Sequence, residues 1–272
     1  MHFTNPKRVR AACSGLLIAL FFFIPIAYVI MIAFEPPNHF ITNPLTPSVP
    51  TLSNFGAAWQ QGDLGPELGN TVLYSVVAAG LSTALGLLLA FPIARSLIRH
   101  ASWLYRFLVI GLCFPLPVIP LFIESRWLHL FDNRPGYIIL HVETGIPFGV
   151  VILTAFIASI PRELDEAALL DGAPYLRYLR AVIVPLAWPS IVITFVYSLL
   201  AVYNDIIGPE VFLANPSLFP VTRGVYNFYG SNESAWTILA AAVIIVSLPV
   251  VALFAVSQRQ LLRSTLGITG VR

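Results

Sequence analysis

Charged side chains gather between two long apolar runs, in the segment from Pro161 to Pro185. The charged residues of this segment are Arg162, Glu163, Asp165, Glu166, Asp171, Arg177 and Arg180. A charged helix between two membrane spans can lie at the water interface and press against a soluble partner. The chemistry that this segment offers is therefore polar docking, and it is the first candidate for a functional site.

A short helix is predicted inside this segment. Ser159 offers a hydroxyl that can cap free amides, and Pro161 is tolerated in a first turn. Residues 162–170 contain strong helix formers, and Gly172 is a stop signal. One flank of this helix is small and apolar, which would let another surface approach closely, and it consists of Leu164, Ala167 and Ala168. From physics alone, a docking helix and an ordinary solvated interfacial helix both fit this pattern.

A second group of polar side chains lies near the end of an apolar run. Ionisable groups inside a span cost about 2.5 to 3.5 kcal/mol at its centre, so they normally face a cavity or a partner. We expect Glu143, with His141, Asn204 and Asp205, to line the outer half of a pathway and to bond hydroxyl groups. Pairing of Glu143 with a partner subunit is an equal alternative. A metal site is disfavoured, because residues two apart do not share a helix face.

These residues are set in a chain whose composition suits lipid. Apolar residues make up 57% and charged residues 10%, with a mean hydropathy of +0.82, which indicates an integral membrane protein. A span needs about 20 apolar residues. Six runs meet that length, near 11–34, 70–94, 104–123, 136–158, 182–203 and 236–256, the third broken by residues 114–117. The prediction is an all-α polytopic membrane protein with about six spans, a single domain over 1–272, and a connecting loop at 159–181.

The basic residues predict the orientation, since Arg and Lys stay mostly on the cytoplasmic side. Twelve of the fifteen fall on one side of this map, leaving Arg126, Arg134 and Arg223 on the other. We therefore expect both termini and the charged segment after the fourth span to be cytoplasmic. The net charge of +2 reflects this bias and does not indicate nucleic-acid binding.

Lysine is nearly absent from the chain. Lys7 is the only one, and it lies outside any Gly-rich context, so the chain has no phosphate-binding loop of the G-x-x-x-x-G-K-[ST] type. If nucleotide powers transport through this chain, another subunit must carry the ATPase site.

Three short sequences resemble a known signature. Glu166-Ala167-Ala168, Asp171-Gly172 and, nine residues past the glycine, Val182 to Pro185 resemble the EAA motif of ABC importer permeases. Valine replaces the usual isoleucine and leucine at two positions of the last group. Residues 51–55, residues 70–71 and the sequence Tyr203-Asn204-Asp205 are similar to the maltose-type, six-span sugar permeases, with Tyr203 in place of tryptophan.

The resemblance implies a function and a set of partners. The chain would form half of the pathway for a sugar or related polyol in a bacterial inner membrane. It would bind no cofactor itself and would work with a second permease subunit, a solute-binding protein and an ATPase dimer that holds ATP and Mg²⁺. The residues that the resemblance implies for coupling to the ATPase are Arg162, Glu163, Leu164, Asp165, Glu166, Ala167, Ala168, Asp171, Gly172 and Pro185.

Two alternatives stay open from the sequence. The solute of such a permease could be glycerol phosphate or another non-sugar compound. The chain could also be an autonomous secondary transporter or an intramembrane enzyme. Those activities require coupling carboxylates, or a nucleophile with its base, well inside the spans, and apart from Glu143 such residues are lacking.

Overall fold

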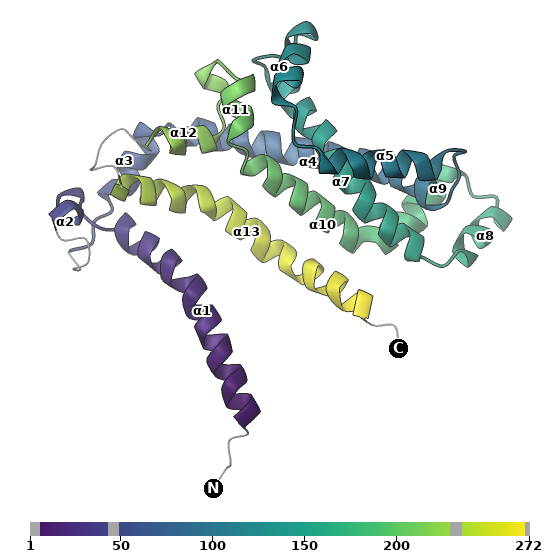
Figure 1. The fold of residues 1–272 in the computed structure, drawn as a ribbon, viewed down its shortest axis with the longest axis horizontal. Helices are drawn as coiled ribbons and strands as arrows, with labels where there is room; N and C mark the ends of the chain where they lie inside the picture. The colour runs from purple at the N-terminus through teal and green to yellow at the C-terminus, as the bar shows by residue number, and fades with distance from the viewer. Residues whose placement is uncertain (1–5, 43–48, 229–235, 270–272) are drawn as a thin grey trace. The chain divides into compact units, whose positions relative to one another are not determined.

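The fold is built of helices throughout the part of the chain that the structure, a computed structural model, describes: residues 6–42, 49–228 and 236–269 (Figure 1). The α-helices are α1 (Pro6–Ala33), α2 (Pro37–Thr42), α3 (Ser53–Gln61), α4 (Leu64–Ala94), α5 (Ala101–Cys113), α6 (Val118–Trp127), α7 (Arg134–Ser159), α8 (Glu163–Leu170), α9 (Tyr175–Tyr178), α10 (Val184–Tyr203), α11 (Ile207–Phe212), α12 (Val221–Asn227) and α13 (Trp236–Thr269). A π-helical turn, η1 (Leu179–Ile183), joins α9 to α10, and a 3₁₀ turn, η2 (Pro216–Leu218), precedes α12.

Four of the predicted spans are long apolar helical segments, one of which includes the π-helical turn η1. Among the described residues, the segments Leu64–Ala94, Arg134–Ser159, Tyr175–Tyr203 and Trp236–Gln258 are long and apolar enough to cross a membrane. The first run contributes the shorter apolar stretch Ala19–Ala33 of α1. The predicted all-helical membrane fold is confirmed, and the expected count of about six spans is approximately matched.

The third predicted run differs from a simple span. It consists of α5 and α6, which are bent by 111° relative to each other. Pro115 and Pro117 lie in the break between them, and proline lacks the backbone N–H that a continuous helix requires. The run from 104 to 123 is therefore a broken span or a re-entrant segment.

Two compact units make up the chain, one formed by 1–65 with 224–248 and the other by 66–223 with 249–272. In the first unit, the amide of Asn54 ties α3 to the end of α1. Its Nδ2 donates to the carbonyl oxygens of Ala33 at 2.9 Å and Glu35 at 2.8 Å. Ala33 ends α1 and Glu35 follows it, and carbonyls at a helix end need partners, so the buried asparagine satisfies both.

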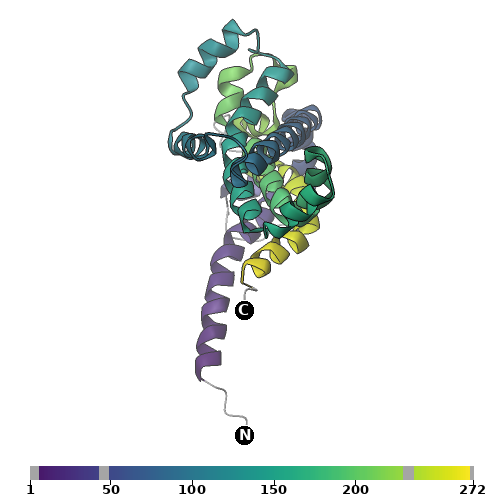
Figure 2. The same ribbon diagram turned by 90° about the vertical axis from the view of Figure 1, so that its right-hand side faces the viewer.

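The second unit contains the helices that carry the candidate sites. Within it, α7 and α10 lie side by side (Figures 1 and 2). A buried cluster around Leu153 joins α4, α7, α9 and η1, and a second around Tyr74 joins α4, α7, α10 and α11. These two clusters fix the two ends of the α4, α7 and α10 group.

Small residues let α4 and α7 approach closely between the two clusters. A Cβ on Gly86 would lie 3.3 Å from the backbone of Gly149, and a Cβ on Gly145 would lie 2.9 Å from the side chain of Ser82. Such close backbone contact is typical of helices packed in a membrane, where dispersion forces and not water exclusion hold helices together.

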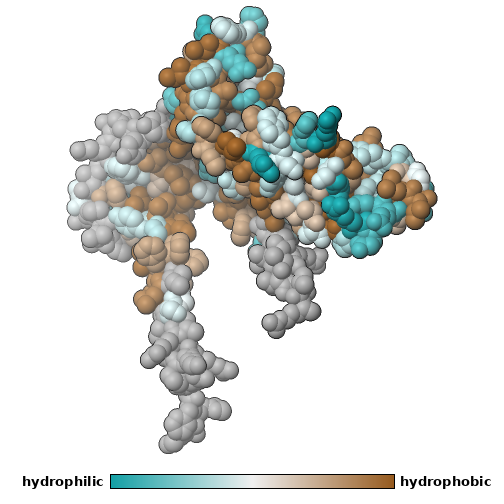
Figure 3. Space-filling view, turned by 45° about the vertical axis from the view of Figure 1, so that its right-hand side comes forward, coloured by the Kyte–Doolittle hydropathy of each residue, from teal (hydrophilic) through white to brown (hydrophobic). Residues whose placement is uncertain are grey.

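Large apolar side chains remain exposed along the spans. Figure 3 shows apolar colour over much of the visible surface. Exposed apolar side chains along the helices include Leu73, Leu88 and Leu248. An apolar surface of this extent is covered in a native protein by lipid or by another chain.

Candidate functional site

The predicted helix in the charged segment is confirmed as α8. It ends in a Schellman motif, in which the N–H of Gly172 donates to the carbonyl of Leu169 at 3.1 Å and the N–H of Ala173 donates to that of Ala168 at 3.0 Å. Gly172 has a φ of +65°, a conformation that glycine adopts without steric cost. The stop signal in the sequence therefore marks the end of the helix correctly.

The predicted start of α8 is wrong in detail. Ser159 belongs to the last turn of α7, and its hydroxyl donates to the carbonyl of Phe156 at 2.6 Å, so it caps nothing in α8. Ile160, with a ψ of 131°, is extended because it precedes Pro161, and α8 begins only at Glu163. Helix α7 thus ends at Ser159, one residue beyond the predicted span end at 158.

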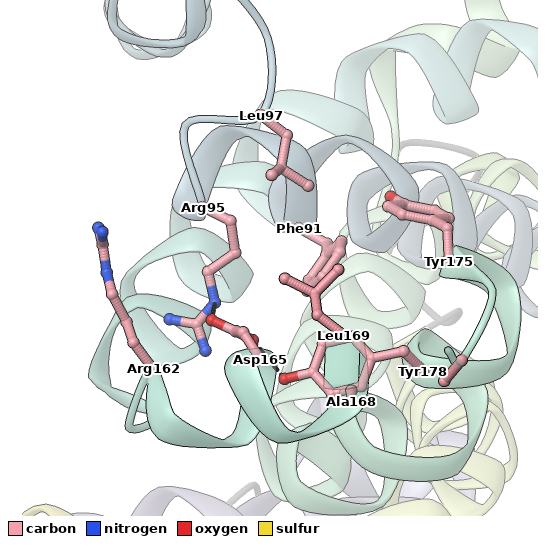
Figure 4. Close-up of a pocket in the computed structure, with 10 residues that line it drawn as sticks. Phe91, Arg95, Leu97, Arg162, Asp165, Ala168, Leu169, Tyr175 and Tyr178 are labelled. Carbon is pink, nitrogen blue, oxygen red and sulfur yellow. Dashed lines mark hydrogen bonds and ion pairs between the residues drawn. The ribbon is translucent and has the colours of Figure 1, made fainter. Parts of the chain in front are cut away.

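A carboxylate on α8 holds this helix against two neighbouring elements (Figure 4). Asp165 forms an ion pair with Arg95, with 2.8 Å between Oδ2 and Nε, and it accepts a hydrogen bond from the hydroxyl of Tyr178. Nη1 of Arg95 also donates to the carbonyl of Ile160 at 3.1 Å. We call Asp165, Arg95 and Tyr178 the Asp165 site. The side chain of Arg95 is 5% exposed and that of Asp165 is 22% exposed, so this site is largely shielded from water.

Most other positions of α8 are open. Leu169 is 77% and Leu170 is 89% exposed, and Glu166 and Ala167 are also exposed. Ala168 is half-buried against the Leu153 cluster. The remaining members of the predicted coupling set, Arg162, Glu163, Leu164 and Asp171, are exposed as well, and Pro185 lies in the first turn of α10.

A pocket of about 240 Å³ lies beside α8, between the end of α4 and α9 (Figure 4). Its walls are mostly apolar and include Phe91, Leu97, Leu169 and Tyr175, with Arg162 and the Asp165 site as the charged groups. The rings of Phe91 and Tyr175 meet edge to face, 5.2 Å apart between centroids. The Asp165 site therefore lies at the edge of an apolar surface.

The predicted pathway residues are only partly brought together. Oδ2 of Asp205 lies 3.2 Å from Nε2 of His141 and accepts a 2.9 Å hydrogen bond from the hydroxyl of Tyr137. Oδ1 of Asp205 accepts from the N–H of Gly208 at 3.0 Å. This group, the Asp205 site, ties the end of α10 to α7 and to the start of α11.

Local electrostatics favour the ionised form of Asp205. Burial alone would raise the pKa of its carboxyl, but the neighbouring His141 and hydrogen bonds from the Gly208 amide and Tyr137 together lower that pKa below its ordinary value. A Cβ at position 208 would lie 2.0 Å from Oδ2 of Asp205, so only glycine leaves room for the carboxylate.

The other two predicted pathway residues lie apart from the Asp205 site. Glu143 is exposed and lines a separate pocket of about 70 Å³ with Glu124 and Ser125 of α6. Asn204 is exposed and its Nδ2 donates to the carbonyl of Leu200 at 2.8 Å. Because helix residues are spaced by about 100°, His141 and Glu143 point to different sides of α7. Among the described residues, no group of three or more His, Cys, Asp or Glu side chains could hold a metal ion.

A larger pocket of about 250 Å³ lies beside His141, between α7 and α10, with Leu112 of α5 at its edge. Phe148 and Tyr197 stack in its lining, with ring centroids 3.9 Å apart and 19° between planes. The buried hydroxyl of Ser198 also lines it and has no hydrogen-bond partner among the described residues. We call this the α7–α10 pocket; it combines aromatic faces with hydroxyl and imidazole groups.

Sequence reasoning missed several residues of these sites. Two of them could have been found from the sequence. Arg95 is a charged residue directly after an apolar run, and Tyr137 precedes His141 by four residues, which places both on the same helix face. Ser198 gave a weaker indication, because it is a hydroxyl residue inside an apolar run. Nothing in the sequence separates Tyr178 and Phe148 from ordinary packing residues.

Known proteins resemble this chain in sequence and in fold. The family model described as "Binding-protein-dependent transport system inner membrane component" matches residues 82–265. The chain is similar to the diacetylchitobiose uptake system permease protein NgcG of Streptomyces coelicolor, at 27% identity over 95% of this chain and 88% of that protein. It is also similar to the inner membrane ABC transporter permease protein YcjP of Escherichia coli, at 30% identity over 75% of this chain and 73% of that protein.

A solved structure shares the fold. A chain of a bacterial ABC transporter involved in the import of the acidic polysaccharide alginate superposes with a TM-score of 0.83. The two sequences are 22% identical, and the match covers 95% of this chain and 99% of that chain.

Proposed function

Because the chain belongs to the family of binding-protein-dependent transport system inner membrane components, we propose that it forms half of an ATP-driven import pathway and receives its motion through α8. A second permease chain supplies the other half, an ATPase pair binds ATP and Mg²⁺, and a solute-binding protein delivers the solute. In this arrangement, residues 1–272 form one permease domain with both termini and α8 on the cytoplasmic side.

One observation carries the proposal. The EAA-like residues form a short helix whose inner face is fastened by Asp165 and whose outer end exposes Leu169 and Leu170. Fully burying one leucine stabilises an interface by about 1.5 to 3 kcal/mol, so a cleft that covers both would hold α8 firmly. The exposed carboxylate of Glu166 adds a polar contact beside them. The chain, which has no phosphate loop of its own, thus presents an exposed apolar surface that a separate ATPase subunit can cover.

Site-directed crosslinking tests this contact in the assembled complex. A Leu170→Cys variant, with Cys13 and Cys113 changed to serine, is expected to crosslink to the ATPase subunit with a short bifunctional reagent. An exposed position on the predicted outer side, Asn215→Cys, serves as the matched control and is expected to give no such product. Equal crosslinking from both positions, or none from Leu170→Cys in an assembled complex, would contradict docking through α8.

A sugar or related polyol is the solute that we propose. Both NgcG and the alginate transporter are named for carbohydrates, and the α7–α10 pocket offers stacked aromatic rings beside hydroxyl groups. Aromatic faces pack against the C–H face of a sugar ring, and the hydroxyl of Ser198 can bond a sugar hydroxyl. A phosphate-bearing solute would call for arginine or lysine, and His141 is the only basic residue in the described lining.

The predicted pathway residues take different parts in this proposal. His141 lines the α7–α10 pocket, and Asp205 holds the His141 ring in place. Glu143 and Asn204 stay predicted contacts of the pathway on surfaces outside this pocket, where a partner subunit would complete their surroundings.

A further inference from the structure

We propose that Asp165 is a positioning residue that fastens α8 to the membrane spans, so that movement of α8 is passed to α4 and α10. This inference rests on the proposed function and deepens it. Asp165 belongs to the set first expected to contact the ATPase, but its geometry assigns it an internal role.

The covalent connections of α8 are poorly suited to transmit force. Before it, Ile160 is extended and Arg162 provides no side-chain cap. After it, Gly172 has a positive φ and Pro174 is extended, with a ψ of 150°. A rigid helix joined by two short non-helical links can turn about those links. Side-chain contacts must therefore hold α8 in register with the spans.

The contacts of Asp165 provide that connection on two sides. Arg95 follows the last residue of α4, and Tyr178 ends α9 and leads through η1 into α10. One carboxylate thus joins α8 to the ends of two membrane spans. Arg95 adds a third link, because its Nη1 also binds the carbonyl of Ile160 in the connection before α8.

Both oxygens of Asp165 are occupied within the chain, one by Arg95 and the other by Tyr178. Its neighbour Glu166 is exposed and points about 100° further round the helix. The two adjacent carboxylates therefore have different roles: Glu166 contacts the partner, and Asp165 contacts the spans. The buried guanidinium of Arg95 makes the internal contact hard to break, because an unpaired charge would remain in a shielded site.

The test compares solute uptake with ATP hydrolysis in the complete complex, reconstituted with its partners and probed with radiolabelled diacetylchitobiose, the sugar for which NgcG is named. In Asp165→Ala, uptake is expected to fall about fivefold or more while ATP hydrolysis stays within about twofold, so more ATP is spent per solute. Asp165→Glu keeps the carboxylate and is expected to restore most of the uptake. Tyr178→Phe removes one of the two contacts and is expected to give an intermediate ratio.

Other outcomes would overturn the inference. A parallel fall of uptake and hydrolysis at equal complex abundance would mean that Asp165 serves docking or folding only. Unchanged uptake and hydrolysis would mean that the contacts of Asp165 do not pass the movement of α8 to the spans. Failure of the proposed function looks different, because the wild-type complex itself would then show no ATP-dependent uptake of the probe sugar.

Discussion

Replacing Gly172 with valine is expected to lower ATP-driven uptake about tenfold or more, because it changes the end of α8. The φ of +65° at this position costs an ordinary residue about 1 to 2 kcal/mol, and a β-branched side chain more. Relief of that strain would unwind the Schellman motif and redirect the exposed Leu169 and Leu170. Uptake by the assembled complex in proteoliposomes, normalised to its abundance, measures the effect.

Asparagine at the same position is the matched control. Asparagine tolerates a positive φ far better than valine, so Gly172→Asn is expected to keep most of the uptake. A Cβ on Gly172 would meet no atom within 4 Å in this chain, so collisions inside the chain do not distinguish the two variants. If asparagine and valine abolish uptake equally, the backbone conformation is not the reason that glycine is needed.

Removing the ring of Tyr197 is expected to raise the KM for solute about tenfold, because the stacked pair in the α7–α10 pocket loses one face. Tyr197→Ala is the test variant, and Tyr197→Phe, which keeps the ring, is expected to stay close to wild type. Initial rates of uptake against the concentration of loaded solute-binding protein and of solute give the KM.

The maximal rate of ATP hydrolysis separates a pocket effect from a coupling effect. It is expected to stay near the wild-type value in Tyr197→Ala, since α8 and the Asp165 site lie at the other end of α10. An unchanged KM in the alanine variant would remove the α7–α10 pocket from the solute pathway.

Local features of the fold were predictable, because helix formers and stop signals act over a few residues. The helix before Gly172 followed from such signals, and so did the apolar runs that became α4, α7, α10 and α13. Pro115 and Pro117 indicated a break between α5 and α6, but the angle of 111° between the two helices depends on packing. The start of α8 was misjudged because Ser159 can serve either a helix end or a helix start.

Contacts between distant segments were not predictable in the same way. Arg95 and Asp165 are far apart in the chain, and nothing in the residue pattern around either one specifies the other. The grouping of His141 with Asp205 was expected from their shared end of neighbouring spans, whereas Glu143 lies two residues further along α7 and lines a different pocket. A helical pattern predicts which face a residue occupies, and only the packed structure shows what that face meets.

Transport by the purified chain, alone and with its partners, tests the central claim most directly. Proteoliposomes that enclose ATP and Mg²⁺ on the α8 side are expected to take up radiolabelled sugar only when the second permease chain, the ATPase pair and a loaded solute-binding protein are all present. Omission of the ATPase pair is expected to reduce uptake to the level of empty vesicles. Sustained uptake by this chain alone would contradict the account, because the motion would then need no external motor.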